Sequence, residues 1–530
     1  MTATEAVDVL VAGGGTGGVA AALAAARLGA RVTLTEPTKW LGGQLTSQAV
    51  PPDEHISIET AGCTAAYRAF RDGVREYYRQ RFPLSDGARA ARHLNPGGGW
   101  VSPVCHEPRV AVAVLDAMLA PYRAAGLLTV HAEHEPVAAD VDGDTVRAVR
   151  FRSRADGSER IVEAAYVLDA TETGDLLPLT GTEYVTGFES AAETGEPDAP
   201  ADAQPLNMQA ITWCMAVEHR PGEDHTIDRP AGYDFWRAYR HPAWAGRPLL
   251  SWYGPGERPA GYRMDPDPDD DPQAAYIDHR RIPPRPDLWT YRRVVARRTF
   301  RPGTCDNDVT ILNWPMNDYP VGPVFEVPAE DAERHLAGAR DLTLSLLYWL
   351  QTEAGYPGLR PRGDVTGTPD GLAMAPYIRE SRRIRAVTTV VAHDVLVSLR
   401  GDHGARGFPD SVGIGHYYWM DLHPSTGGDG GLGGVPHPFE IPLGTLLPVR
   451  MRNLLPAAKN IGTTHLTNGC YRVHPVEWAV GEAAGTLAAH CLDAGLTPHG
   501  VRDDPSRLED FQQLLSKLGV PIRWPGRTAG

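Results

Sequence analysis

Residues 7–18 read VDVLVAGGGTGG, and residues 31–36 read RVTLTE. The opening of the first stretch is short, apolar and β-branched, which predicts a buried strand. Gly13, Gly15 and Gly18 then form G-x-G-x-x-G where that strand meets an alanine-rich helix. The first glycine permits a tight turn, the second lets the backbone approach a pyrophosphate, and the third lets the helix pack closely on the strand. The N-terminus of that helix would point its free N–H groups at the phosphates.

Glu36 ends a second predicted strand, Val32–Glu36, eighteen residues after Gly18. A carboxylate in this place can accept both hydroxyls of an adenosine ribose. Its charge would repel a ribose 2′-phosphate, so the site suits FAD or NAD rather than NADP. A structural glycine turn that binds nothing is the alternative. Strand, glycines, helix, strand and terminal acid together favour a dinucleotide site.

Composition excludes several classes of protein. The chain has 530 residues, 42% of them hydrophobic and 22% charged, which indicates a globular protein larger than one ordinary domain. A formal charge of −15 disfavours a nucleic-acid or anionic-membrane partner. We expect no signal peptide, because the N-terminal residues lack a basic region and the first apolar stretch belongs to the nucleotide unit. No apolar window reaches the ~18 residues that a membrane span needs. Six cysteines without C-x-x-C predict neither a disulfide framework nor a metal site and favour the reducing cytoplasm. No feature indicates the oligomeric state.

Periodicity and composition predict the order of elements and domains. The expected helices are Ala65–Arg81, Pro108–Leu119, Ala329–Glu353 and Pro505–Leu518, and the expected strands are Leu127–Glu135, Pro136–Asp142, Thr145–Ser153 and Ile161–Ala170. Residues 1–185 are predicted to form the first segment of the nucleotide-binding domain, with an insertion at 51–105. Residues 186–436, rich in Pro, Trp and Tyr, form a second domain, and residues 437–500 return to the first. Residues 501–530 are a surface helix and tail.

A second G-x-G-x-x-G occurs at Gly428, Gly430 and Gly433. No strand precedes it and no helix follows it, because His423-Pro424-Ser425-Thr426 stands before it and Val435-Pro436 after it. We therefore interpret it as a flexible loop, and the chain has one predicted dinucleotide site.

Several motifs follow one another in an order typical of a known family. They are WLGGQLTS at 40–47, DATETGDL at 169–176, QPL at 204–206, YIRESRRI at 377–384, NLLPA at 453–457, RVHP at 472–475 and GEAAG at 481–485. Together they resemble the FAD-dependent oxidoreductase family of the glutathione-reductase-like fold, over nearly the whole chain. The resemblance implies FAD as the cofactor. It also implies an α/β fold, in which a Rossmann-like FAD-binding domain, a parallel sheet with a β-meander, is interrupted by a larger α+β substrate domain.

The resemblance implies a set of FAD-binding residues from separate parts of the chain. The pyrophosphate and ribose would meet Gly13, Gly15, Thr16, Gly17, Gly18, Glu36 and Pro37. The ribityl chain and one flavin edge would meet Lys39, Gly42, Gly43 and Gln44. The adenosine, the pyrophosphate and the flavin pyrimidine would meet Val137, Ala170, Thr171, Gly174, Asn460, Ile461 and the helix that begins near Pro475. One departure stands out: the family often has Ala-Gly-Arg where this chain has Ala457-Ala458-Lys459.

Flavin performs the electron chemistry, so the protein has to place the substrate and manage one proton. Within the segments that the resemblance brings to the flavin, His423, His465 and Tyr418 are candidates for that proton. Asp421, two residues before His423, could orient its ring, although any one histidine of nineteen is more often structural. Arg382 could hold a substrate anion, or it could form a structural ion pair.

The leading hypothesis is an FAD-dependent dehydrogenase or oxidase that transfers a hydride from a small polar or natural-product substrate to flavin N5. One alternative is an NAD(P)H-dependent flavin monooxygenase, against which the lack of a second nucleotide motif counts mildly. The other is a lyase, isomerase or binding protein in which FAD is not net-reduced.

Overall fold

The computed structural model describes residues 3–240, 242–254, 261–274, 285–423, 425–426 and 433–525. The N-terminal stretch forms β1 (Ala3–Ala12), α1 (Thr16–Arg27) and β2 (Val32–Glu36), which confirms the predicted strand–helix–strand unit. Of the second glycine motif, Gly428 and Gly430 lie outside the described residues.

The main sheet has the order β3-β2-β1-β6-β5-β4. Its further strands are β3 (Leu128–Ala132), β4 (His134–Asp142), β5 (Thr145–Ser153) and β6 (Glu159–Asp169). One edge of β6 pairs with two strands. Its first half pairs antiparallel with β5, and its end pairs parallel with β17 (Leu454–Pro456). The strands β3, β2, β1, β6 and β17 are parallel, and β4, β5 and β6 form an antiparallel meander. The predicted Rossmann-like parallel sheet with a β-meander is therefore confirmed.

The predicted helices are also present, with small changes at their ends. They are α2 (Ala65–Arg81), α4 (Pro108–Ala124), α9 (Ala329–Thr352) and α16 (Pro505–Lys517). Shorter or later helices are α3 (Asp86–Ala90), α5 (Leu176–Thr180), α6 (Ala191–Thr194), α7 (Tyr233–Ala238), α8 (Leu288–Tyr291), α10 (Gly363–Thr366), α11 (Ala392–Val395), α12 (Val397–Arg400), α13 (His465–Tyr471), α14 (His474–Ala494) and α15 (Pro498–Asp503). No helix among the described residues combines the length and the apolar character needed to cross a membrane.

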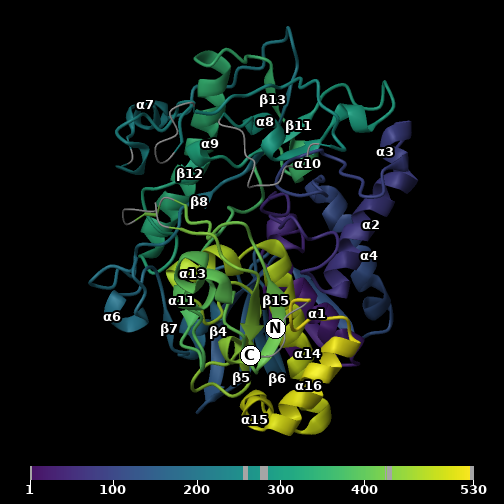
Figure 1. Cartoon of the computed structure of the whole chain (residues 1–530), viewed down its shortest axis with the longest axis vertical. Coiled ribbons are helices and arrows are strands. Elements are labelled where there is room, and N and C mark those ends of the chain that lie inside the picture. Colours follow the sequence, from purple (N-terminus) through teal and green to yellow (C-terminus); the bar gives the residue numbers. More distant parts are fainter. Residues whose placement is uncertain are drawn as a thin grey trace.

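The central part of the chain builds separate, smaller sheets. One has the order β10-β11-β9-β13, from Arg293–Val295, Val309–Leu312, Met215–His219 and Leu359–Pro361. Short antiparallel pairs are β8 (Ile211–Thr212) with β12 (Asp318–Tyr319), β7 (Tyr184–Val185) with β14 (Arg383–Ile384), and β15 (Ser411–Gly415) with β16 (Phe439–Pro442). In Figure 1 the teal part with α7, α9, β11 and β13 lies above the main sheet with α1 and α14, whereas β7 and β15 lie lower, at the level of the main sheet. Division into domains near residues 185 and 436 stays a proposal.

Helices α1 and α14 pack through small residues. A Cβ added to Gly481 would lie 1.9 Å from the carbonyl oxygen of Gly17, and one added to Gly485 would lie 2.1 Å from that of Ala21. Figure 1 shows the two helices side by side, purple α1 beside yellow α14. Helices from the N-terminal and C-terminal parts of the sequence are thus in backbone-to-backbone contact.

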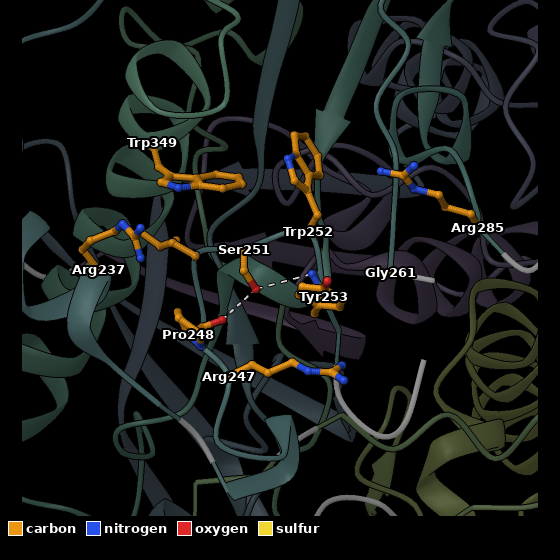
Figure 2. A pocket seen from close by; sticks show the side chains of 10 residues that line it. Arg237, Arg247, Pro248, Ser251, Trp252, Tyr253, Gly261, Arg285 and Trp349 are labelled. Carbon is orange, nitrogen blue, oxygen red and sulfur yellow. Dashed lines mark hydrogen bonds between the residues drawn. The ribbon is translucent and has the colours of Figure 1, made fainter. Parts of the chain in front are cut away.

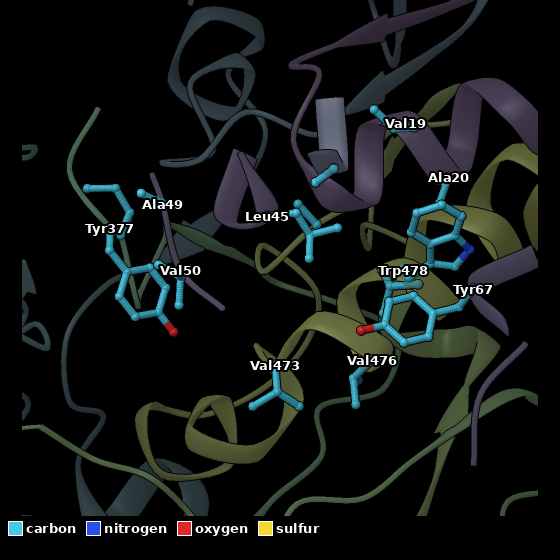
Figure 3. Close-up of a cluster of buried hydrophobic side chains, with 14 of the residues drawn as sticks. Val19, Ala20, Leu45, Ala49, Val50, Tyr67, Tyr377, Val473, Val476 and Trp478 are labelled. Carbon is cyan, nitrogen blue, oxygen red and sulfur yellow. The ribbon is translucent and has the colours of Figure 1, made fainter. Parts of the chain in front are cut away.

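A buried apolar cluster continues outward from this helix pair (Figure 3). Val19 of α1, Tyr67 of α2 and Trp478 of α14 are each fully buried in it, together with Val50 and Tyr377 from intervening segments. The rings of Tyr67 and Trp478 meet edge-on, with centroids 5.6 Å apart. The cluster holds the 51–105 insertion against the nucleotide-binding unit.

We expect Gly481→Ala to destabilise the protein. Its Cβ would collide with the Gly17 carbonyl, and overpacking of this kind costs about 1–3 kcal/mol of unfolding free energy. Gly87→Ala is the matched control, because Gly87 lies exposed in α3 and its added Cβ meets nothing within 4 Å. Calorimetry should show a lower Tm for the first variant and an unchanged or slightly higher Tm for the second. Equal Tm values for Gly481→Ala and the parent would contradict the close contact.

Candidate functional site

The glycine loop lies at the edge of the sheet where the parallel strands end. Gly13 has a φ of 96°, and a Cβ there would lie 2.3 Å from the carbonyl oxygen of Ala170. A Cβ on Gly18 would lie 1.9 Å from the Gly13 oxygen, so the third glycine allows the close helix packing that the motif predicts. The loop is therefore pressed against the end of β6, with the first turn of α1 directly behind it.

Glu36 lies beside this loop and is buried. Its Oε2 accepts from the N–H of Gly14 at 2.9 Å, and its Oε1 accepts from the N–H and Oγ1 of Thr38 at 3.0 and 2.6 Å. Burial raises its pKa to about 7, although the Thr38 and Gly14 hydrogen bonds oppose that rise. The carboxylate is thus fixed next to the turn, where the motif places the ribose.

The segment after β2 folds back over the glycine loop. The N–H of Gly42 donates to the oxygen of Gly14 at 2.7 Å, and Thr16 Oγ1 donates to the Gly42 oxygen at 3.0 Å. Gly43 comes so close that an added Cβ would lie 2.8 Å from the Cα of Gly15. Pro37 is half-buried in this segment, whereas the side chain of Lys39 is exposed.

Gln44 connects this segment to the C-terminal helix. It is fully buried, and its Nε2 donates to the carbonyl oxygen of Arg472 at 3.2 Å and to Glu477 at 2.5 Å. Its Oε1 is buried without a hydrogen-bond partner in the described part of the chain. An unpaired buried acceptor is unfavourable, so this oxygen fits a donor on a bound cofactor.

The remaining residues proposed for FAD come from three segments. Val137 is the extra residue of a β-bulge between Pro136 and Ala138, which leaves its backbone out of the β4–β5 ladder. Asn460 donates from Nδ2 to the carbonyl oxygen of Asp169 at 3.0 Å, next to Ala170. Four further residues lie at or near the same edge of the sheet: Thr171, which bonds to Asp169; Gly174, with a φ of 67°; the buried Ile461; and Pro475, in the first turn of α14.

A buried lysine and two carboxylates border the glycine loop. Lys459 contacts Glu172 closely and lies 3.4 Å from Glu477, whose Oε1 accepts from the N–H of Gly17 at 3.3 Å. Burial alone would lower the pKa of Lys459, but the two carboxylates raise it above its usual range. A Cβ on Gly15 would lie 2.7 Å from Glu172 Oε1. Glu172 therefore faces the surface that the second glycine would offer to a pyrophosphate, and Lys459 is the cation beside it.

His423 lies between two carboxylates. Its Nδ1 is 2.6 Å from Asp318 Oδ2, and its Nε2 is 3.0 Å from Asp421 Oδ2. Asp318 is 2% exposed and also pairs with Arg379 at 2.9 Å, whereas the Asp421 side chain is 28% exposed. Burial alone would raise the pKa of Asp318, but Arg379 and His423 hold it below its usual value. The Nδ1 side of the ring is thus held by a buried carboxylate, and the Nε2 side is held by a more exposed one.

Arg472 links this histidine to the proposed cofactor residues. Its Nη2 donates to Asp421 Oδ2 at 3.1 Å, its Nη1 donates to the hydroxyl of Tyr377 at 2.6 Å, and its carbonyl oxygen accepts from Gln44. Asp421 is held ionised, because His423 and Arg472 outweigh the burial that would raise its pKa. The residues from His423 to Gln44 therefore form one connected polar network.

Further polar groups adjoin the network at the start of α14. The N–H of Asp53 donates to His474 Nδ1 at 2.9 Å, so the ring proton of His474 is on Nε2. Burial lowers the pKa of His474 to about 4, which keeps the ring neutral. Asp53 also pairs with Arg292 at 3.2 Å and accepts from the hydroxyl of Tyr417 at 3.3 Å. Tyr418 is close to the Tyr417 ring, and burial raises its pKa well above the usual range, so it stays a neutral phenol.

His465 and Arg382 contact residues outside the His423 network. His465 is buried, stacks on Phe188 with centroids 4.5 Å apart, and places Nδ1 2.8 Å from Glu380 Oε2. Arg382 donates to Glu326 at 2.7 Å and to Asp175 at 3.3 Å, so the structural ion pair describes it better than an anion holder. Of the four catalytic candidates, His423 and Tyr418 both lie near Asp421. His465 and Arg382 instead pair with Glu380 and Glu326.

Sequence reasoning missed several members of the network, namely Asp53, Arg292, Asp318, Tyr377, Arg379 and Arg472. The sequence does offer a signal for Arg472, because this residue stands two positions before His474, at the start of the helix predicted to approach the cofactor. Asp318 had none, since it pairs with a residue 105 positions away.

The model of the FAD dependent oxidoreductase family matches residues 8–515. The chain therefore belongs to this family, and it is an FAD-dependent oxidoreductase. The residues of the site fit that cofactor, since the glycine cradle, the buried Glu36 carboxylate and the unpaired Gln44 oxygen all border one region.

Comparison with curated proteins found no match. One similar solved structure is a geranylgeranyl bacteriochlorophyll reductase-like protein from Thermoplasma acidophilum, 11% identical over 97% of this chain and 84% of that one, with a TM-score of 0.35. Another is an anhydrotetracycline hydroxylase from Streptomyces rimosus, 11% identical over 97% and 67%, with a TM-score of 0.36. A myxobacterial chondrochloren halogenase is 16% identical over 42% and 46%, with a TM-score of 0.23. Of two solved structures that it matches, the halogenase among them, the chain covers less than half of their own length. Similarities at this level carry no argument about reaction or substrate.

We expect FAD binding to weaken as the pH falls from 8 to 6. The ribose needs an ionised acceptor, and burial raises the pKa of Glu36 to about 7, so protons compete with FAD below that value. The Kd should rise by up to about tenfold per pH unit there. Glu36→Gln should raise the Kd at pH 8 by about ten- to hundredfold and flatten its pH dependence. Titrating the FAD-free protein measures both, with the exposed Glu163→Gln as control. A Glu36→Gln protein with the parental Kd at pH 8 would show that Glu36 is not the ribose ligand.

Lys459 and Glu172 should affect FAD affinity in opposite directions. Lys459→Met removes the cation beside Gly15 and should weaken binding about tenfold or more, whereas Glu172→Gln removes a charge that repels phosphate and should strengthen it. Lys517→Met, at an exposed lysine at the end of α16, is the control. The same direction of change in both variants would rule out this electrostatic arrangement.

Proposed function

We propose that this protein is a dehydrogenase or oxidase that takes a hydride from a small polar substrate, with His423 accepting the substrate proton. The observation that supports this most is the connected network from Asp318 through His423, Asp421 and Arg472 to Gln44. It joins a histidine oriented by a buried carboxylate to the segment proposed to border the flavin. When bound, FAD supplies the electron chemistry by accepting the hydride at N5.

The two sides of the His423 ring suit different tasks. Asp318, anchored by Arg379, accepts the Nδ1–H and sets the orientation of the ring. Nε2 faces the more exposed Asp421. The ionised Asp421 accepts a proton from Nε2, so this proton has to leave to solvent before His423 can act as a base. A substrate hydroxyl or amine would then take the place of Asp421 at Nε2, and Arg472, already 3.1 Å from Asp421, would retain the displaced carboxylate. Proton transfer from the substrate to Nε2 then leaves an imidazolium that Asp318 stabilises.

The charges of the network indicate the substrate class. Arg292 pairs with Asp53, Arg379 with Asp318, and Arg472 with Asp421. Each of these arginines thus has a carboxylate, and the neighbouring tyrosines are neutral. This environment suits a neutral or weakly charged substrate with hydroxyl or amine groups better than a phosphorylated one.

The test is anaerobic mixing of the FAD-loaded protein with a panel of alcohols, polyols, amines and hydroxy acids, while flavin absorbance is followed. Bleaching by one member without a pyridine nucleotide supports the proposal. Bleaching by NADH or NADPH alone would replace it with the monooxygenase. Turnover of a panel member without bleaching would indicate a lyase or isomerase.

His423→Asn should slow flavin reduction by the substrate about 10²–10⁴-fold, as expected for loss of a general base. Reoxidation by O₂ should stay normal, because only proton removal from the substrate is affected. Asp318→Asn should slow reduction less and shift its pH profile, as expected for a positioning residue. Stopped-flow absorbance measures each step.

His465→Asn is the matched control for this histidine. It removes a buried ring from its contacts with Phe188 and Glu380, so it should lower Tm while reduction proceeds at the parental rate. Fast reduction in His423→Asn together with slow reduction in His465→Asn would assign the proton to His465 instead.

A further inference from the structure

A cavity of about 500 Å³ lies in the central part of the chain, apart from the residues of the His423 network. Its walls include Arg237 of α7, Trp349 of α9, and Arg247, Ser251, Trp252 and Arg285 from the segments between them (Figure 2). The volume falls within the range of roughly 300–1,000 Å³ that is usual for small-molecule sites.

Two tryptophans form the aromatic part of the wall. Trp349 is held by α9 and is 6% exposed. Trp252 lies against it with ring centroids 5.3 Å apart and planes inclined by 60°, and it also meets Tyr356 edge-on at 6.3 Å. The inclined pair makes a corner in which a planar ring can stack on one indole and meet the other, an arrangement that aromatic rings favour.

The charged part of the wall is positive. Arg237 pairs through Nε with Glu353 at 2.8 Å. Arg285 donates from Nε to the carbonyl oxygen of Tyr262 at 3.0 Å, and the guanidinium of Arg247 lies 4.4 Å from the centroid of the Tyr253 ring. Among the described residues that line the cavity none is acidic, and neither Arg247 nor Arg285 has a carboxylate partner within the described parts of the chain.

Arg247 carries the strongest indication of a ligand. Its Nη1 is buried and has no hydrogen-bond partner in the described residues. A buried N–H of a charged group without an acceptor is costly, and a carboxylate or phosphate oxygen would satisfy it. In a chain of formal charge −15, a local excess of guanidinium groups also concentrates anions there. This cavity thus differs from the His423 network, where each arginine already has its carboxylate.

We propose that this cavity is a second ligand site, which binds a small molecule carrying a planar aromatic ring and an anionic group, either phosphate or carboxylate. The ring stacks in the corner between Trp252 and Trp349, and the anion contacts Arg247 and Arg285. The cavity shares no residue with the His423 network.

Calorimetric titration of the FAD-loaded protein tests the proposal. The probes are adenosine 5′-monophosphate and indole-3-acetate, with adenosine, indole and inorganic phosphate as their separate parts. At least one ring-bearing anion should bind about tenfold or more tightly than either of its parts, and the better probe shows whether phosphate or carboxylate is preferred. Flavin absorbance should not change on binding.

Substitutions of the residues that line the cavity test where the probe binds. Arg247→Gln should weaken the better probe about tenfold or more, and Trp252→Leu should remove the advantage of the ring, while FAD content stays the same. Arg240→Gln removes the same charge from an exposed residue that does not line the cavity, and it should bind as the parent does. Equal binding in Arg247→Gln and the parent would overturn the proposal. So would binding that inorganic phosphate alone reproduces, or a probe that alters the flavin spectrum.

Discussion

The contact between α1 and α14 is the constraint on which the site depends. Where Gly481 faces the carbonyl of Gly17 and Gly485 faces that of Ala21, there is no room for a single added carbon. This contact fixes the first turn of α14 against the glycine loop, although the two elements are more than 450 residues apart in sequence. Arg472, just before α14, is thereby held where it can meet both Gln44 and Asp421. Cofactor segment and polar network are positioned by the same pair of helices.

Charge is distributed differently in the two parts of the molecule that we propose bind small molecules. Around His423 each buried arginine meets a carboxylate, so the arginine charges are balanced, and the histidine ring lies between one buried and one more exposed carboxylate. In the cavity between Trp252 and Trp349 the described guanidinium groups exceed the carboxylates. The balanced charges around His423 therefore suit proton transfer, whereas the excess of arginines in the cavity suits anion binding.

The features that could be predicted from the sequence are those that depend on residues close together in the chain. The N-terminal strand–helix–strand unit, α2 and α9 each carry their own periodicity and end signals within a few tens of residues, and their observed bounds agree to within a few residues. The glycine roles could be predicted because turn geometry and helix packing act within one motif, as Gly13 and Gly18 show. The parallel sheet followed from the same unit together with the family resemblance.

The catalytic assignment that we propose could not be reached in this way, because it depends on long-range partners. His423 and His465 look equivalent in the sequence, and only their surroundings separate them: Asp318 and Asp421 at one, Phe188 and Glu380 at the other. The same holds for Lys459, whose partner Glu172 is 287 positions away. Side chains that meet across such distances leave no local pattern.

A crystal structure of the FAD-loaded protein tests the account most directly. It should show the flavin ring beside Gln44 and the first turn of α14, Glu172 moved away from Gly15, and the Nε2 side of His423 facing the space over the flavin. A flavin that lies elsewhere, or a His423 ring separated from it by other side chains, would contradict the account.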